Sequence, residues 1–189
     1  RYGHHLDSLL DIVSLQPGLE VAASMSIMVL EKGSFFFCDP YVNLNPTICQ
    51  LAEMAVMAAA QVRKFGIVPK LALLSHSNFG TYHDESALKM RRVLEKIRCI
   101  APELEVEGEM HADAALSEMI RLKTFPHSSL KGQANLLIMP NLDTANIAFN
   151  MIKVMADGQP LGPILLGPSK PIHILTPSVT TRGIFNMSA

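Results

Sequence analysis

The sequence predicts an α/β fold, with a mainly parallel sheet that carries helices on both faces. Short apolar runs typical of strands alternate with longer segments of helical period, as expected when crossover helices cover a parallel sheet. The chain has 189 residues, of which 49% are hydrophobic and 17% charged. This size suits one globular domain, or two small subdomains that share a cleft.

Charge and hydropathy exclude several classes of protein. The 16 Lys and Arg residues are balanced by 17 Asp and Glu residues, so the basic surface that nucleic-acid binding requires is not expected. Every strongly apolar run is broken by a charge, proline or glycine before the roughly 18 residues needed to cross a bilayer. We therefore expect a protein that binds neither nucleic acid nor membrane.

The cysteines indicate the cellular compartment, and the first residue indicates whether the chain is a whole protein. Cys38, Cys49 and Cys99 are widely spaced within apolar segments, which predicts buried thiols in a reducing, cytoplasmic compartment. The chain begins at Arg1, and no charged segment leads into an apolar signal sequence. We interpret the chain as part of a longer protein.

The first half of the chain contains the clearest element boundaries. Asn45 or Thr47 can cap a helix in which Pro46 suits the first turn, and Gly66 ends it. The turn at Glu31-Lys32-Gly33 predicts a hairpin. The expected elements are a helix at 6–15, strands at 25–30 and 34–38, a helix from 45–47 to 66, and a strand at 70–75.

The second half continues the alternation. A charged helix follows the polar loop after residue 75, and Asp143 is expected to cap a later helix that Gly158 ends. The expected elements are helices at 84–98, 113–122 and 143–158, strands at 104–106, 136–139, 163–166 and 171–175, and a last helical start after Thr180.

Common catalytic and nucleotide-binding motifs are missing from the sequence. It contains neither G-x-G-x-x-G, nor the P-loop pattern, nor G-x-S-x-G, nor H-E-x-x-H. His76 and His83 flank a polar loop without ligands at metal spacing, so a structural metal is not expected. His111-Ala112-Asp113 is open to two interpretations, a catalytic pair or a helix cap at Asp113.

Two polar loops follow buried strands, where α/β folds place ligands. The first provides Ser75, Ser77 and Asn78 as hydrogen-bond partners for an anionic or carbonyl ligand. The second runs from Asn141 to Asn146 into a helix start, whose free N–H groups favour an anion. The alternatives are a polar surface loop and simple helix capping.

A series of segments resembles the phosphotransacetylase family from about Leu6 to the end of the chain. The segments are Asn45-Pro46-Thr47, Leu73-Leu74-Ser75-His76-Ser77, Gly108-Glu109-Met110-His111-Ala112-Asp113-Ala114-Ala115, Ala134-Asn135-Leu136-Leu137-Ile138-Met139-Pro140-Asn141-Leu142, Asn146-Ile147, Gly162-Pro163-Ile164-Leu165-Leu166-Gly167 and Lys170-Pro171. The resemblance implies an isocitrate/isopropylmalate dehydrogenase-like fold in which two α/β subdomains face each other over a coenzyme A cleft. This chain would be the second half of that module.

The chain departs from the family near its end. The family's L-S-R-G segment and its later Asp align with Leu175-Thr176-Pro177-Ser178 and Gly183, so the catalytic Ser, Arg and Asp are replaced. The stretch from Ile174 to Met187 instead resembles the phosphotransacetylase-like domain of large bacterial malic enzymes. That resemblance implies a regulatory and oligomerisation domain that binds acetyl-CoA without acetyl transfer. The missing N-terminal part would decarboxylate malate oxidatively with NADP or NAD and Mg or Mn.

The expected effector contacts combine positive charge with hydrogen-bond donors, because acetyl-CoA is anionic. They are Ser75, Ser77, Asn78, Asn141, Asn146, Lys170, Thr176, Ser178 and Arg182. We expect no catalytic or metal-binding residue and no cofactor in this chain. Its expected partners are a second copy, as a homodimer or higher oligomer, and the catalytic domain of the same polypeptide.

Two alternatives remain, an active phosphate acetyltransferase fragment and a purely structural assembly module. We expect a central α/β subdomain at about 20–168. Residues 1–19 and 169–189 would contact or belong to the missing subdomain.

Overall fold

The fold comprises twelve helices and strands in the described part of the chain. The structure is a computed structural model that describes residues 2–174, 181, 184 and 185. In order, the elements are α1 (Tyr2–Leu10), β1 (Ala23–Leu30), β2 (Gly33–Cys38), α2 (Ile48–Lys64), β3 (Lys70–Leu74), α3 (Glu85–Ile100), β4 (Glu105–Met110), α4 (Ala112–Leu116), α5 (Glu118–Thr124), β5 (Leu136–Ile138), α6 (Leu142–Met155) and β6 (Gln159–Leu166).

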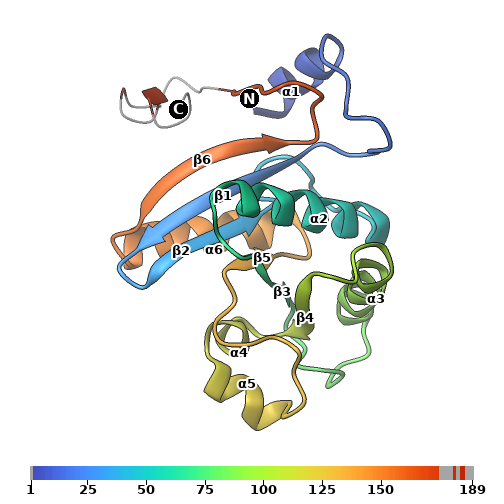
Figure 1. The fold of residues 1–189 in the computed structure, drawn as a ribbon, viewed down its shortest axis with the longest axis vertical. Helices are drawn as coiled ribbons and strands as arrows, with labels where there is room; N and C mark the ends of the chain where they lie inside the picture. Colours follow the sequence, from blue (N-terminus) through green and yellow to red (C-terminus); the bar gives the residue numbers. More distant parts are fainter. Residues whose placement is uncertain (1, 175–180, 182–183, 186–189) are drawn as a thin grey trace.

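The strands form one mixed, six-stranded sheet in the order β4-β3-β5-β2-β1-β6 (Figure 1). The four strands from β4 to β2 are mutually parallel, whereas β1 pairs antiparallel with both β2 and β6. The expectation of a mainly parallel sheet therefore holds only for these four strands. The predicted hairpin at residues 31–33 reverses the chain and makes β1 antiparallel.

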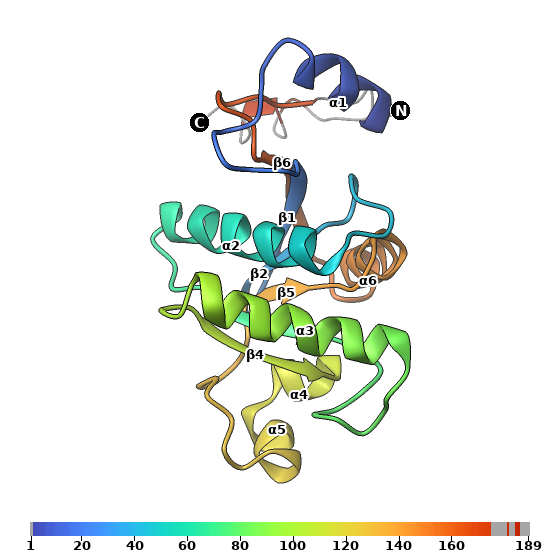
Figure 2. The ribbon, with the colours of Figure 1, turned by 90° about the vertical axis from the view of Figure 1, so that its right-hand side faces the viewer.

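Helices cover both faces of the sheet, as predicted. α2 and α3 lie side by side on one face (Figure 2), while α4 and α6 contribute to the core on the other. Side chains alternate between the two faces along each strand, because the strand period is two residues. In β3, Leu71 and Leu73 join the first core cluster, and Ala72 and Leu74 join the second.

Helix α2 begins and ends where the sequence predicts. Its N-cap is Thr47, whose hydroxyl accepts from the backbone N–H of Gln50, while the Gln50 side chain accepts from the N–H of Thr47. This is a capping box. Gly66, with φ +73°, follows the last turn in the left-handed conformation that suits glycine.

The N-terminal helix differs from its prediction. It spans Tyr2–Leu10 rather than residues 6–15. The N–H groups of Ile12 and Val13 both bond to the carbonyl of Leu9 in a turn, and Leu15 forms an isolated bridge with Pro168. Pairing with a distant segment thus ends the helix sooner than its apolar pattern predicts.

The helix predicted at residues 113–122 is divided into α4 and α5. Ser117 adopts an extended conformation, with φ −134° and ψ +109°, and its hydroxyl accepts from the N–H of Ile120 to cap α5. Serine competes with the helical backbone for hydrogen bonds, which explains the break. Of the two interpretations left open for His111-Ala112-Asp113, a helix cap at Asp113 is wrong, because the N-cap residue of α4 is His111.

Two strand predictions also require correction. β4 spans Glu105–Met110 rather than 104–106, since Glu107 and Glu109 are buried despite their charge. Residues 171–174 do not form the predicted final strand, and β6 covers Gln159–Leu166. Residue 175 and most of the helical start expected after Thr180 lie outside the described residues.

Only one of the three cysteines is buried, contrary to the prediction. Cys38 is enclosed in β2, where burial raises the pKa of its thiol and the neighbouring Asp39 adds to the shift. Cys49 and Cys99 are free and exposed. Both lie on helices, where a thiol within an apolar segment can still face outward.

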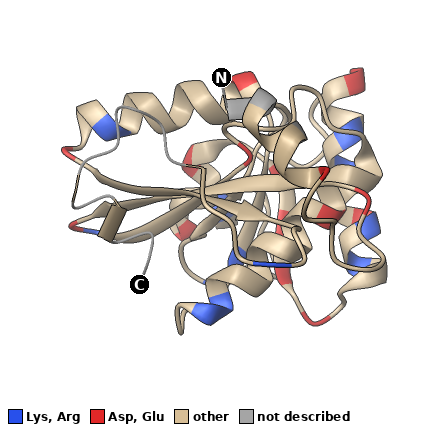
Figure 3. Cartoon of the chain, turned by 90° about the horizontal axis from the view of Figure 1, so that it is seen from above, with Lys and Arg blue, Asp and Glu red and all other residues tan. Residues whose placement is uncertain are grey.

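Charged residues of both signs are interspersed over the helices and loops (Figure 3). None of the helices in the described part of the chain combines the length and apolar character that a membrane span needs.

Candidate functional site

The parallel strands bring four loops to one edge of the sheet. Because β2, β3, β4 and β5 run in the same direction, their carboxyl ends meet there. We call this the carboxyl edge. It comprises residues 39–47 after β2, 75–84 after β3, 111–113 after β4 and 139–146 after β5.

The loop after β3 is tied to the end of β4. The Ser77 hydroxyl is buried and donates to Oε1 of Glu109 at 2.6 Å, and the Gly80 N–H donates to the same oxygen at 2.9 Å. Asn78 accepts from the N–H of His111 at 2.8 Å. Ser75 accepts from the N–H of Ser77 at 3.1 Å. The three predicted contacts thus also fix the shape of their own loop.

Glu109 of β4 holds this loop in place, and sequence reasoning missed it. It is 1% exposed, and Nε of Arg91 lies 3.2 Å from its second carboxylate oxygen. The Arg91 guanidinium also donates to the carbonyl of Tyr82. The strand predicted at 104–106 ends before Glu109, so the local pattern gave no sign that this charge is buried and paired.

Two further buried carboxylates hold neighbouring loops. Asp39 accepts from the backbone N–H groups of Tyr41, Val42 and Asn43, at 2.9–3.1 Å, and from the hydroxyl of Ser24. Glu107 accepts from the N–H of Ser129 at 2.9 Å and pairs with Arg98 at 3.2 Å. The contacts of Asp39 thus preorganise a loop of the carboxyl edge, whereas those of Glu107 hold the loop between α5 and β5.

Lys89 connects two loops of the carboxyl edge, a role that the sequence pattern did not predict. Its Nζ donates to Oδ1 of Asn45 at 3.0 Å and to the carbonyl of Pro140 at 3.1 Å. Burial lowers the pKa of Lys89, and the nearby Glu85 opposes that shift. The lysine lies on a helix whose charged residues resemble a solvated face, so the pattern gave no sign of this contact.

The second predicted loop is the N-terminus of α6. Its cap is Asn141 and not Asp143, because Oδ1 of Asn141 accepts from the N–H of Thr144 at 3.0 Å. Asp143 lies in the first turn. Asn146 donates to the carbonyl of Pro40 at 3.2 Å and so joins α6 to the loop after β2.

Two histidines make contacts in the loop after β3, one from within the loop and one from the end of β4. Nε2 of His76 lies 2.9 Å from Asp84, and Nε2 of His111 lies 2.7 Å from the carbonyl of His76. The pKa of Asp84 is lowered, chiefly by the hydrogen bond from the Ala87 N–H and further by His76. No group of three or more potential metal ligands is found among the described residues.

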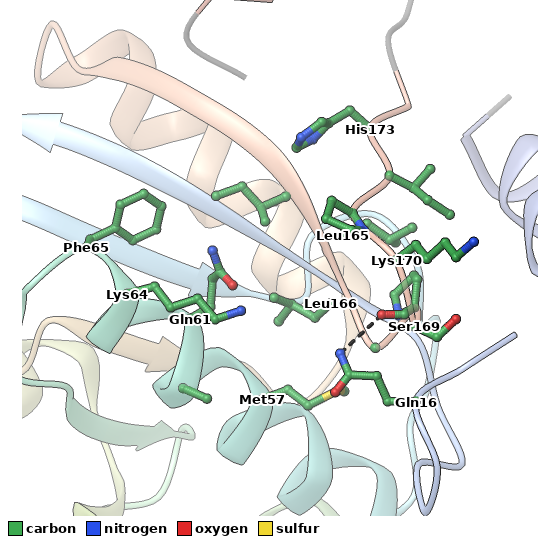
Figure 4. Close-up of a pocket in the computed structure, with 16 residues that line it drawn as sticks. Gln16, Met57, Gln61, Lys64, Phe65, Leu165, Leu166, Ser169, Lys170 and His173 are labelled. Carbon is green, nitrogen blue, oxygen red and sulfur yellow. Dashed lines mark hydrogen bonds between the residues drawn. The ribbon is translucent and has the colours of Figure 1, made fainter. Parts of the chain in front are cut away.

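Lys170 lies apart from the other predicted contacts. It stands at the rim of a cavity of about 580 Å³ between α2 and the segment after β6 (Figure 4). Three strands, β5, β2 and β1, separate β3 from β6 in the sheet. The structure therefore brings Ser75, Ser77, Asn78, Asn141 and Asn146 to one edge without Lys170. Thr176, Ser178 and Arg182 lie outside the described residues.

Similar proteins fall into two groups. Over all 189 residues the chain is 48% identical to the NAD-dependent malic enzyme of Rhizobium meliloti and 49% identical to the NADP-dependent malic enzyme of Salmonella typhimurium. It covers 24% and 25% of their lengths, so the matching region is one part of a longer chain. It is 32% identical to the phosphate acetyltransferase of Clostridium acetobutylicum, covering 95% of this chain and 56% of that protein.

Solved structures agree with this grouping. A phosphotransacetylase from Streptococcus pyogenes superimposes with a TM-score of 0.93 at 30% identity, over 97% of this chain and 56% of that one. The EutD phosphotransacetylase from Staphylococcus aureus gives 0.90 at 28% identity, over 95% and 56%. The family described as phosphate acetyl/butaryl transferase matches residues 1–189. The chain belongs to this family, and within it resembles the region that forms about a quarter of NAD- and NADP-dependent malic enzymes.

Proposed function

We propose that the chain is the regulatory and assembly domain of a malic enzyme, and that it binds acetyl-CoA as an effector without transferring the acetyl group. The observation that carries the proposal is the alignment of all 189 residues with malic enzymes at 48–49% identity, against 32% for a phosphate acetyltransferase. Oxidative decarboxylation of malate, with NADP or NAD and a divalent metal, belongs in this proposal to the part of the polypeptide outside this chain.

The carboxyl edge supports an effector site. Loops fixed by buried carboxylates can offer backbone N–H groups and the half-buried Ser75 and Asn141 to an anionic ligand without much ordering cost. Lys89 has two of its three N–H groups engaged, which leaves one donor at this edge.

Loss of acetyl transfer follows from the replaced residues. Thr176, Pro177 and Gly183 stand where the resembling enzymes carry Ser, Arg and Asp, so the base and the positive charge that stabilise the reaction are missing. Among the described serines, Ser77 is committed to the buried Glu109.

Self-association is the assembly part of the proposal. α6 exposes an apolar row on the side opposite its buried Ala145 and Phe149, and the row consists of Ile147, Met151, Val154 and Met155. The spacing i, i+4, i+7, i+8 gives one continuous stripe, a surface suited to a second copy. Without such a partner it would remain in water.

Two assays on the complete polypeptide test the proposal. Calorimetric titration with acetyl-CoA should show saturable binding, whereas acetyl phosphate with coenzyme A should give no turnover above the uncatalysed rate. Absence of acetyl-CoA binding would favour a purely structural module. Turnover that Thr176→Ala abolishes would instead establish an active acyltransferase.

A further inference from the structure

The cavity beside β6 has the size of a ligand site. Its volume is about 580 Å³, within the roughly 300–1,000 Å³ range of small-molecule pockets. One wall is the second half of α2, and the other is the segment from Ile164 to His173 (Figure 4). Gln16 closes one end, where its amide donates to the carbonyl of Pro168 at 3.1 Å.

The charged side chains that line the cavity are basic. Lys64 and Lys170 line the cavity together with His173, and none of the lining residues that the structure describes is an Asp or Glu, although the chain as a whole has one more acid than base. Lys64 and Gln61 lie together on α2 in the middle of the view, His173 lies on the opposite wall, and the amine of Lys170 points away from the centre (Figure 4).

The side chains of Lys64 and Gln61 make no hydrogen bond or ion pair with any residue that the structure describes. The Lys64 side chain is exposed, so its unpaired ammonium group is accessible to an anion that enters the cavity.

The rest of the lining is apolar and includes an exposed aromatic ring. Met57, Leu165 and Ile172 line the walls, and Phe65 is 46% exposed beside Lys64. A flat ligand can stack on such a ring, and free amide groups such as that of Gln61 can bond the edge of a base.

We propose that this cavity binds a nucleoside mono- or diphosphate. Lys64 would hold the phosphate, with Lys170 adding positive potential and His173 offering a ring nitrogen as a hydrogen-bond partner, while Phe65 and the apolar walls would contact the base. The cavity lies away from the loops of the carboxyl edge, so the inference goes beyond the effector role proposed above, and only Lys170 is common to both.

The inference is tested by hydrogen–deuterium exchange on the complete polypeptide, with ADP as the probe. Exchange is followed peptide by peptide, so that ADP bound elsewhere in the protein does not contribute to the signal. ADP should slow exchange in peptides that contain residues 57–65 and 164–173. Lys64→Gln should raise the ADP concentration needed for half of this protection at least tenfold.

Arg63→Gln is the matched control, since Arg63 is adjacent to Lys64 and pairs with Glu103 outside the cavity, at 3.8 Å. It should change the required ADP concentration less than twofold. Gln61→Glu, which adds a carboxylate of nearly the same shape, should abolish the protection. Adenosine and inorganic phosphate, tested separately, should each protect only at much higher concentrations.

Three results would overturn the inference. One is no protection of these peptides at millimolar ADP, and another is an equal effect of the two substitutions at Lys64 and Arg63. The third is protection by inorganic phosphate or acetyl-CoA at concentrations where ADP gives none. Failure of acetyl-CoA to bind would contradict the proposed effector role but would leave the expected effects of ADP unchanged.

Discussion

Individual buried carboxylates determine the loop geometry at the carboxyl edge. Asp39, Glu107 and Glu109 are each no more than 3% exposed. Asp39 and Glu109 accept hydrogen bonds from loops of the carboxyl edge, whereas Glu107 accepts from the loop between α5 and β5. Burying a charge is costly unless it is paired and hydrogen-bonded, so these residues stabilise one loop conformation only while their partners remain.

Replacing Glu109 by Gln should destabilise the protein by about 2–4 kcal/mol, because the Arg91 guanidinium loses its counter-charge and Ser77 loses a charged acceptor. Urea unfolding measures the change. Glu103→Gln is the control, since Glu103 forms only an exposed pair with Arg63, and it should cost less than about 0.5 kcal/mol. Equal effects of the two substitutions would show that Glu109 does not organise the loop.

The Asp84 carboxyl should titrate below its ordinary value of about 3.9, because its charged form accepts hydrogen bonds. Since the folded-state pKa is the lower one, its contribution to stability is present above the unfolded-state pKa and is lost as pH falls through the folded-state pKa. NMR titration should show that His76→Ala raises the Asp84 pKa only in part, because the Ala87 N–H bond is the larger cause. An unshifted value in the unsubstituted protein would contradict this account.

At the scale of elements, short-range sequence patterns such as caps and turns predicted the helix and strand boundaries well. The capping box at Thr47, the glycine at residue 66 and the turn at residues 31–33 fix α2 and the β1–β2 hairpin through contacts between near neighbours. The predicted boundaries were wrong where contacts between residues far apart in the sequence determine the structure. Leu15 pairs with Pro168, and buried Glu107 and Glu109 depend on partners 9–32 residues away, which no periodicity reveals.

The candidate site shows the same division. The strand-end rule placed Ser75, Ser77, Asn78, Asn141 and Asn146 on the carboxyl edge, because strand ends can be read from apolar runs. It did not reveal Lys89, which reaches the edge from an adjacent helix, or the separation of Lys170 beyond β1. Both depend on the strand order, which local patterns leave open.

Self-association should depend on the outer stripe of α6. Met151→Glu places a charge in the apolar row and should weaken association at least tenfold, since desolvating an unpaired charge at an interface costs more than about 1.4 kcal/mol. Sedimentation of the complete polypeptide measures the change. Lys153→Glu makes the larger charge change of two units on another side of α6 and should nevertheless have little effect. A monomeric unsubstituted protein at micromolar concentration would refute the assembly proposal.

At the scale of the whole molecule, the fold is that of phosphotransacetylases while the sequence is closer to that of malic enzymes. Nearly half the residues are identical across the matched region of those malic enzymes, against about a third in an acetyltransferase. A scaffold that once positioned a reaction can serve as a binding domain when its reactive residues are replaced, because fold and site vary independently.

The most direct test of the regulatory role is the rate of malate oxidation by the complete polypeptide as a function of acetyl-CoA concentration, with and without Arg182→Ala. We expect a saturable response in the unsubstituted protein. A lost charge-assisted bond of about 1.5–3 kcal/mol should shift it to roughly ten- to a hundredfold higher acetyl-CoA, with the rate in the absence of effector nearly unchanged. A rate independent of acetyl-CoA in the unsubstituted protein would contradict the account.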